Sequence, residues 1–259
     1  MKTFLKTLIA TSLLIGSLAQ AQSVPKHLQL ARDFAANIKI ENNDYTNTKP
    51  FTLMPGDAKY DGKWVVDSDC SAFVADMLDR AYPDLLSGLT TRKFRTRYSL
   101  FDLLGSIERE EIFKQVKTVG ELMPGDVVMW IHPKKDSSGD TGHVVFVDSL
   151  PKKVAGRKPF KFTLDQYEIR VVDVSQEAKS EDDPRFVTDR SERAANLAKG
   201  KQRGNAASSS RRGIGTGSIR LYVDKAGALQ GVAFNTPGAD LKEPDNEYRL
   251  YMARANLKN

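Results

Sequence analysis

The chain contains one cysteine, Cys70, which opens a segment whose apolar residues recur at helical spacing. This spacing predicts a helix over 70–82, with Ser68 or Asp67 as the expected cap. A helix N-terminus stabilises negative charge through its amides and its dipole, so it lowers the pKa of a thiol and favours the nucleophilic thiolate. Asp69 would oppose this effect if its carboxylate pointed inward, and we expect it to point away. The pattern therefore predicts a cysteine used for nucleophilic chemistry.

A second reactive side chain, His143, follows Gly142 at the start of an apolar run over 143–147 that predicts a β-strand. A histidine in this position can present its ring at the edge of a sheet, where a helix N-terminus could meet it. A Pro-Gly-Asp turn at 124–126 precedes another apolar run, 127–131, and is expected to launch a strand beside the same site. The sequence therefore contains a possible thiol–imidazole pair.

The composition excludes several other kinds of site. One cysteine in 259 residues rules out a disulfide within the chain and a zinc cluster built on several thiolates. Only three histidines are present, and we interpret His27 and His132 as structural, so a His-rich metal site is not expected. With 40% hydrophobic and 28% charged residues, most of the chain is expected to be globular.

The first 21 residues are typical of a secretory signal peptide. Lys2 and Lys6 precede an apolar stretch over 8–18, and a small-x-small cleavage pattern follows at 19–21. The stretch is too short to span a bilayer, although a retained N-terminal anchor helix is an alternative. Cleavage would remove the two lysines, lower the formal charge from +6 to +4 and leave no transmembrane segment. Because no cysteine near the cleavage point could carry a lipid, we expect a periplasmic or secreted protein that is not a lipoprotein.

The remaining patterns predict an α+β domain with an antiparallel sheet, because a helical N-terminal part is followed by consecutive strands. Helices are expected over 25–40 and largely over 98–116, and loop composition fills 41–63. The strands are predicted at 127–131, 143–147, 167–174, 219–223, 229–234 and 248–253. The turn at 225–227 should join two of them as a hairpin.

Two segments are interpreted as insertions. Residues 151–159 are basic and rich in turn formers, which is typical of an inserted hairpin loop. Residues 177–217 are polar and charged, and we interpret them as a long surface insertion with a short helix near 191–198. The basic run over 190–212 could contact the wall, lipid headgroups or nucleic acid, but export argues against nucleic acid. The Gly-x-Gly-x-Gly cluster at 213–217 precedes a strand, so it indicates closely packed backbone instead of a dinucleotide site.

Taken in order, three of these segments resemble the NlpC/P60 family of papain-like cysteine peptidases. The segments are Asp69-Cys70-Ser71-Ala72-Phe73-Val74, the Pro-Gly-Asp strand entry and the Gly142-His143-Val144 strand. Ala72 stands where the family motif has a glycine. The resemblance covers roughly residues 60–175 and implies a papain-like fold with helices packed on an antiparallel sheet. It predicts a single catalytic domain over 22–259, elaborated by a C-terminal β extension over 176–259.

The resemblance also implies roles for individual residues. Cys70 would be the nucleophile and His143 the base. A third, polar residue on the next strand would orient the imidazole, and Asp173 is the acceptor within the apolar end of that strand, with Ser175 and Gln176 as alternatives. The residues predicted to bind substrate are Tyr60, Trp64 and Ser71.

The family usually cleaves peptide bonds in bacterial cell-wall stems, so the resemblance implies amide hydrolysis in peptidoglycan through a Cys thioester. No metal or organic cofactor is expected, the predicted partner is a peptidoglycan peptide, and no nucleic acid is expected. The alternatives are a thiol-dependent amidase or acyltransferase on the same fold, and a non-catalytic cell-envelope binding protein. The presence of all three predicted catalytic residues disfavours the last alternative. The sequence assigns neither the cleaved bond nor the oligomeric state.

Overall fold

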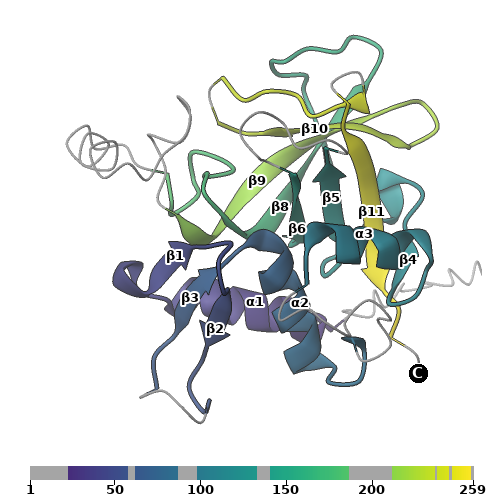
Figure 1. Ribbon diagram of the computed structural model, residues 1–259. Coiled ribbons are helices and arrows are strands. Elements are labelled where there is room, and N and C mark those ends of the chain that lie inside the picture. The colour runs from purple at the N-terminus through teal and green to yellow at the C-terminus, as the bar shows by residue number, and fades with distance from the viewer. Residues whose placement is uncertain are drawn as a thin grey trace, which may run out of the picture.

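The computed structural model in Figure 1 describes residues 23–57, 62–86, 98–132, 141–186, 212–236, 238–244 and 247–257. The predicted signal peptide and the short helix expected near 191–198 lie outside these residues. The described part combines three α-helices with strands that are mostly antiparallel, so the prediction of a mixed α+β fold is confirmed.

The helices are α1 (Lys26–Asn37), α2 (Cys70–Ala81) and α3 (Leu100–Glu108), with short 3-10 turns η1 (Ile40–Asn42) and η4 (Val119–Glu121). Helix α1 packs on α2, and α2 packs on strands β6 and β8 of the main sheet. The helix predicted over 98–116 is too long, because the chain turns at Glu110, which has a φ of 51°, and then forms β4. No described helix is long and apolar enough to span a membrane.

The main sheet has eight strands in the order β10-β9-β8-β6-β5-β11-β4, with β7 paired to β8. They are β4 (Phe113–Gln115), β5 (Val127–Ile131), β6 (Gly142–Val147), β7 (Lys152–Val154), β8 (Asp165–Ser175), β9 (Gly213–Val223), β10 (Leu229–Phe234) and β11 (Arg249–Ala255). All their pairings are antiparallel. The predicted strands are therefore confirmed, and the C-terminal strands extend the same sheet that contains β5 and β6.

Both faces of the main sheet are buried at β5, which explains why this strand is apolar at every position. In β5, Val127, Met129 and Ile131 pack in the core shared with the helices. Val128 and Trp130 alternate with them and pack in a second core formed mainly by strands. The helices cover the face that carries Val127, Met129 and Ile131. The face that carries Val128 and Trp130 is covered mainly by other strands of the sheet and by loops.

A small sheet leads directly into α2. It contains β1 (Asn43–Tyr45), β3 (Val65–Ser68) and β2 (Phe51–Leu53), in the order β1-β3-β2. The expectation of loop throughout 41–63 is therefore wrong, because three-residue strands are too short to show an alternating pattern between turn-forming residues. Since β3 ends two residues before Cys70, this sheet fixes where α2 begins.

Candidate functional site

An aspartate caps the helix that begins at Cys70. Asp69 Oδ1 accepts hydrogen bonds from the Ala72 amide at 2.8 Å and from the Ser71 hydroxyl at 2.7 Å. The cap expected at 67–68 is therefore wrong, as is the expectation that Asp69 points away from the helix start. A carboxylate in this place offsets part of the positive potential of the helix end. The helix alone is thus a weaker source of thiolate than predicted, which increases the need for a neighbouring base.

Cys70 lies at the end of the main sheet that also holds His143 and Asp173. Asn43 of β1 makes two hydrogen bonds with the backbone of Ile214, at 2.9 and 2.7 Å, where β9 begins and β8 ends. Strand β1 pairs in parallel with β3, which leads into α2. This chain of contacts fixes the start of α2 beside the end of β8. The Cys70 side chain is buried there, with 6% of the residue exposed.

His143 is held at the start of β6 between an aromatic ring and a carboxylate. Its ring centroid lies 5.2 Å from that of Trp130, the residue opposite it in β5. Gly142 precedes it with a φ of 118°, and a Cβ at that position would collide with the Trp130 carbonyl oxygen. Only glycine fits in this conformation and this space, so the Gly-His pair of the sequence positions the imidazole.

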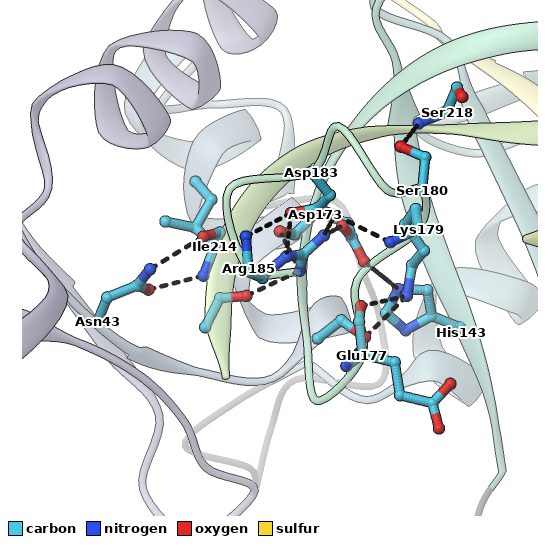
Figure 2. A network of polar contacts seen from close by, with 12 residues as sticks. Asn43, His143, Asp173, Glu177, Lys179, Ser180, Asp183, Arg185, Ile214 and Ser218 are labelled. Carbon is cyan, nitrogen blue, oxygen red and sulfur yellow. Dashed lines mark hydrogen bonds and ion pairs between the residues drawn. The ribbon is translucent and has the colours of Figure 1, made fainter. Parts of the chain in front are cut away.

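Asp173 in β8 is fully buried, and its carboxylate contacts three nitrogen-bearing side chains (Figure 2). His143 Nε2 lies 2.5 Å from Asp173 Oδ2, and because an ionised carboxylate can only accept, Nε2 is the protonated nitrogen. Arg185 Nη2 donates to Oδ1 at 2.6 Å, and Lys179 Nζ lies 3.3 Å from Oδ2. Arg185 also binds Asp183 at 2.7 Å, so two carboxylates and two cations form one buried network next to the imidazole.

The cations of this network come from the start of the predicted surface insertion. Lys179, Asp183 and Arg185 are only 1–2% exposed, so the expectation of a surface segment is wrong for these three residues, although Glu181, Asp182 and Pro184 beside them are exposed. Their sequence has the charged composition of an exposed segment, and charged residues are seldom buried unless they are paired. The pairing depends on the distant Asp173, which local sequence does not reveal. Residues 187–211 of the insertion lie outside the described part.

The glycine cluster at 213–217 makes room for these charged side chains. A Cβ on Gly215 would collide with the Arg185 guanidinium, and one on Gly217 would lie 2.9 Å from an Asp183 carboxylate oxygen. The prediction of closely packed backbone is confirmed. Three glycines in five residues indicate that bulky groups pack against the start of β9. The glycines do not indicate that these groups are the charged side chains of Arg185 and Asp183.

The network sets the charge state of Asp173. Burial raises the pKa of its carboxyl, but Arg185, Lys179 and His143 together lower this pKa by more, so the net shift is far below the ordinary range. Burial lowers the pKa of Lys179, and the attraction of Asp173 only partly opposes this. Asp173 is therefore a carboxylate at neutral pH, which the acceptor role toward His143 requires.

Acid is expected to destabilise the protein through Asp173. Because the pKa of this carboxyl is lower in the folded state than in the unfolded chain, where it is about 3.9, only the unfolded state gains a proton as the pH falls below about 4. The stabilisation is present above pH 4 and declines below it by about 1.4 kcal/mol per pH unit. Urea unfolding between pH 5 and 3 should show this contribution on top of that of the other carboxyls whose pKa is lowered, and the slope should be smaller by this amount in Asp173→Asn.

An equal slope in the variant would contradict this assignment. If Asp173→Asn does not fold, a ¹³C titration of the aspartate carboxyls in the wild type measures the same pKa directly.

The alternatives to Asp173 for the third position have other partners. Ser175 Oγ accepts from Lys179 Nζ at 2.8 Å, and Gln176 Oε1 accepts from Arg212 at 3.4 Å. The geometry therefore favours Asp173 as the residue that orients His143.

Two of the three residues predicted to bind substrate lie in the described part, and both have structural partners there. Trp64 packs edge-on against Phe34 of α1, with ring centroids 4.8 Å apart. Ser71 is buried, and its hydroxyl belongs to the Asp69 cap. Tyr60 lies outside the described residues. A substrate-binding role for these three residues stays a prediction.

The Pro-Gly-Asp turn at 124–126 does not lie beside the site. The Gly125 amide donates to the Val147 carbonyl at 2.8 Å, which places the turn at the far end of β6 from His143. His27 binds the Gly125 carbonyl at 2.8 Å and is buried, in agreement with its interpretation as structural. This turn therefore organises the opposite end of the β5–β6 pair.

The described residues contain no group of three or more His, Cys, Asp or Glu side chains that could hold a metal ion. No family model matches the chain, and no solved structure matches it. The chain is similar to the uncharacterized protein R653 of Acanthamoeba polyphaga mimivirus, with 23% identity over 220 residues. The alignment covers 82% of this chain and 88% of the viral protein, so the similarity extends over most of both chains.

Proposed function

We propose that this protein is an exported cysteine peptidase of the NlpC/P60 type that hydrolyses amide bonds in peptidoglycan stem peptides. The observation that carries the proposal is the 2.5 Å contact between His143 and Asp173, at the end of the sheet where the helix of Cys70 begins. A thiol, an imidazole and a carboxylate that orients the imidazole are the parts of a nucleophilic triad. Their order on a helix and two neighbouring strands of one sheet supports the papain-like interpretation.

In the proposed reaction, the Cys70 sulfur attacks the amide carbon after its proton has passed to His143. With Nε2 turned toward Asp173, Nδ1 is the ring nitrogen that exchanges this proton. The backbone amide of Cys70 stabilises the oxyanion. The C–N bond then breaks, and His143 gives its proton to the amine that leaves. Water, deprotonated by His143, attacks the thioester, which releases the acid and restores the thiol.

Asp173 serves mainly to fix the tautomer and orientation of His143. Its charge is shared with Arg185 and Lys179, and two carboxylates face two cations in the network. The carboxylate therefore stabilises an imidazolium less than an isolated carboxylate would. The contribution of Asp173 to the proposed reaction is therefore chiefly geometric, because it holds Nε2 and leaves Nδ1 to take the thiol proton.

The substrate class rests on the signal-like N-terminus and on the resemblance to NlpC/P60 peptidases. An exported protein meets peptidoglycan directly, and the formal charge of +4 expected after cleavage suits an anionic wall polymer. An amidase would attack its amide through the same thiol chemistry. The reaction products therefore distinguish an endopeptidase from an amidase.

The test is digestion of purified peptidoglycan by the full mature protein, followed by mass spectrometry of the products. New stem-peptide fragments still attached to sugar are expected. Release of whole sugar-free peptides would instead indicate an amidase, and transfer of a stem to an added amine would indicate an acyltransferase. Unchanged muropeptides from several wall chemotypes would overturn the proposal.

A further inference from the structure

We propose that a pocket at the opposite end of the β8–β9 pair binds a phosphate group. The pocket has a volume of about 240 Å³ and lies where the β7–β8 loop, the middle of β9 and the end of β10 meet residue 181. It is lined by Arg157, Lys158, Glu181, Arg220, Asn235 and Thr236. Its size suits a small anion better than a large organic ligand.

The strongest observation is the environment of Arg220. The residue is only 3% exposed, and its Nη1 and Nη2 donate to the carbonyl oxygens of Lys158 at 2.5 Å and Phe234 at 3.0 Å. Its buried Nε has no hydrogen-bond partner among the described residues. The two acceptors of these hydrogen bonds are neutral carbonyls, and the nearby Tyr222 and Glu168 offset only part of the cost of burying the charge of Arg220. Burial also lowers the pKa of Arg220, as expected for a cation without sufficient compensation.

The charge of the pocket favours a dianion. Arg157 and Lys158 are exposed and form no ion pair with a described residue, and together with Arg220 they supply three positive charges. Glu181 is the one acid among the lining residues, so the lining carries a formal excess of two positive charges. A phosphate dianion would balance this excess, whereas a single carboxylate would leave one charge uncompensated.

The amide of Asn235 adds an acceptor with a fixed direction. Its Nδ2 donates to Glu168 Oε2 and to Ser218 Oγ, both at 2.8 Å, which determines which end of the amide is oxygen. The buried Oδ1 has no partner among the described residues. A protonated phosphate oxygen would donate to Oδ1, and the anionic oxygens would accept from Arg220 Nε and from the Thr236 hydroxyl.

This pocket is separate from the candidate active site. Arg220 pairs with Glu168 of β8, and Asp173 lies five residues farther along that strand, or about 17 Å at 3.4 Å per residue. The proposal therefore does not depend on the peptidase reaction. The two places are nevertheless joined by the buried start of the insertion, because the backbone N–H of Asn235 donates to the Lys179 carbonyl at 2.6 Å.

The test is calorimetric titration of the full mature protein with inorganic phosphate at constant ionic strength, with acetate and glycerol phosphate as parallel ligands. Saturable binding of phosphate is expected, and acetate should bind much more weakly. Glycerol phosphate that binds as tightly would identify the source as an esterified phosphate, and binding of inorganic phosphate alone would identify the free ion. Equal binding of acetate and phosphate would overturn the assignment to phosphate.

The variant Arg157→Gln/Lys158→Gln removes two exposed charges without touching the buried Arg220. It should weaken phosphate binding about tenfold or more. The control Lys39→Gln/Lys225→Gln removes the same charge from exposed positions elsewhere and should bind as the wild type does. Equal weakening in both variants, or no saturable binding to the wild type, would overturn the proposal.

Discussion

Replacing Cys70 with alanine is expected to lower the rate of amide hydrolysis by a factor on the order of 10⁵ or more. The chain has no other thiol, so no second residue can form the thioester. The fold should survive, because the change removes a single buried sulfur atom from the first turn of α2. The measurement is kcat/KM on a purified muropeptide, with thermal unfolding of each variant to show that it is folded.

Met77→Leu is the matched control for this substitution. Met77 is fully buried on the same helix, and a methionine-to-leucine change conserves volume, so it should cost less than about 1.5 kcal/mol and leave the rate unchanged. A Cys70→Ala protein that is folded and retains activity within tenfold of the wild type would show that the hydrolysis does not pass through a thioester. Loss of activity in Met77→Leu as well would instead point to a general effect on α2.

The elements that hold Cys70, His143 and Asp173 could be predicted because their patterns are local. The apolar spacing of α2 continues over three turns, β5 and most of β6 are apolar runs buried on both faces, and the second half of β8 is buried and mostly apolar. The strands that were not predicted are three or four residues long and depend on pairing with other segments, as β4 does with β11. Such pairing stabilises a strand without leaving a periodic pattern within it.

The charged network next to Asp173 could not be predicted for a different reason. Arg185 and Lys179 have the sequence context of a solvated loop, and their burial is stabilised by Asp173 and Asp183. The only local sequence feature that indicates this packing is the set of glycines that face these side chains, such as Gly215. The helix cap was missed more simply. Ser68, Asp67 and Asp69 are all good N-cap residue types, so the local sequence does not distinguish among them, and the structure assigns the cap to Asp69.

Replacing Arg185 with leucine is expected to lower the free energy of unfolding by about 3–5 kcal/mol at neutral pH. The guanidinium is 2% exposed and binds both Asp173 and Asp183, and it also donates to the Gly213 carbonyl at 2.9 Å. Its removal leaves two buried carboxylates with Lys179 as the remaining cation of the network. Urea unfolding monitored by circular dichroism gives the free energy.

Arg170→Leu is the matched control. Arg170 pairs with Asp182 at 2.8 Å, but both side chains are about half exposed, so this pair is screened by water and should contribute less than about 1 kcal/mol. The comparison holds the residue type and the substitution constant and changes only burial. Equal effects of the two substitutions would show that the Arg185 network does not hold this end of the sheet together.

A double variant separates the loss of a favourable contact from the penalty of an unpaired charge. In Arg185→Leu/Asp183→Asn, one carboxylate is neutralised, and Lys179 remains within 3.3 Å of Asp173 to balance the other. If unpaired charge dominates the loss, the double variant should be more stable than Arg185→Leu alone, although it lacks more hydrogen bonds. If lost contacts dominate, the double variant should be less stable. The first outcome is expected, because burial of both carboxylates is what the guanidinium compensates.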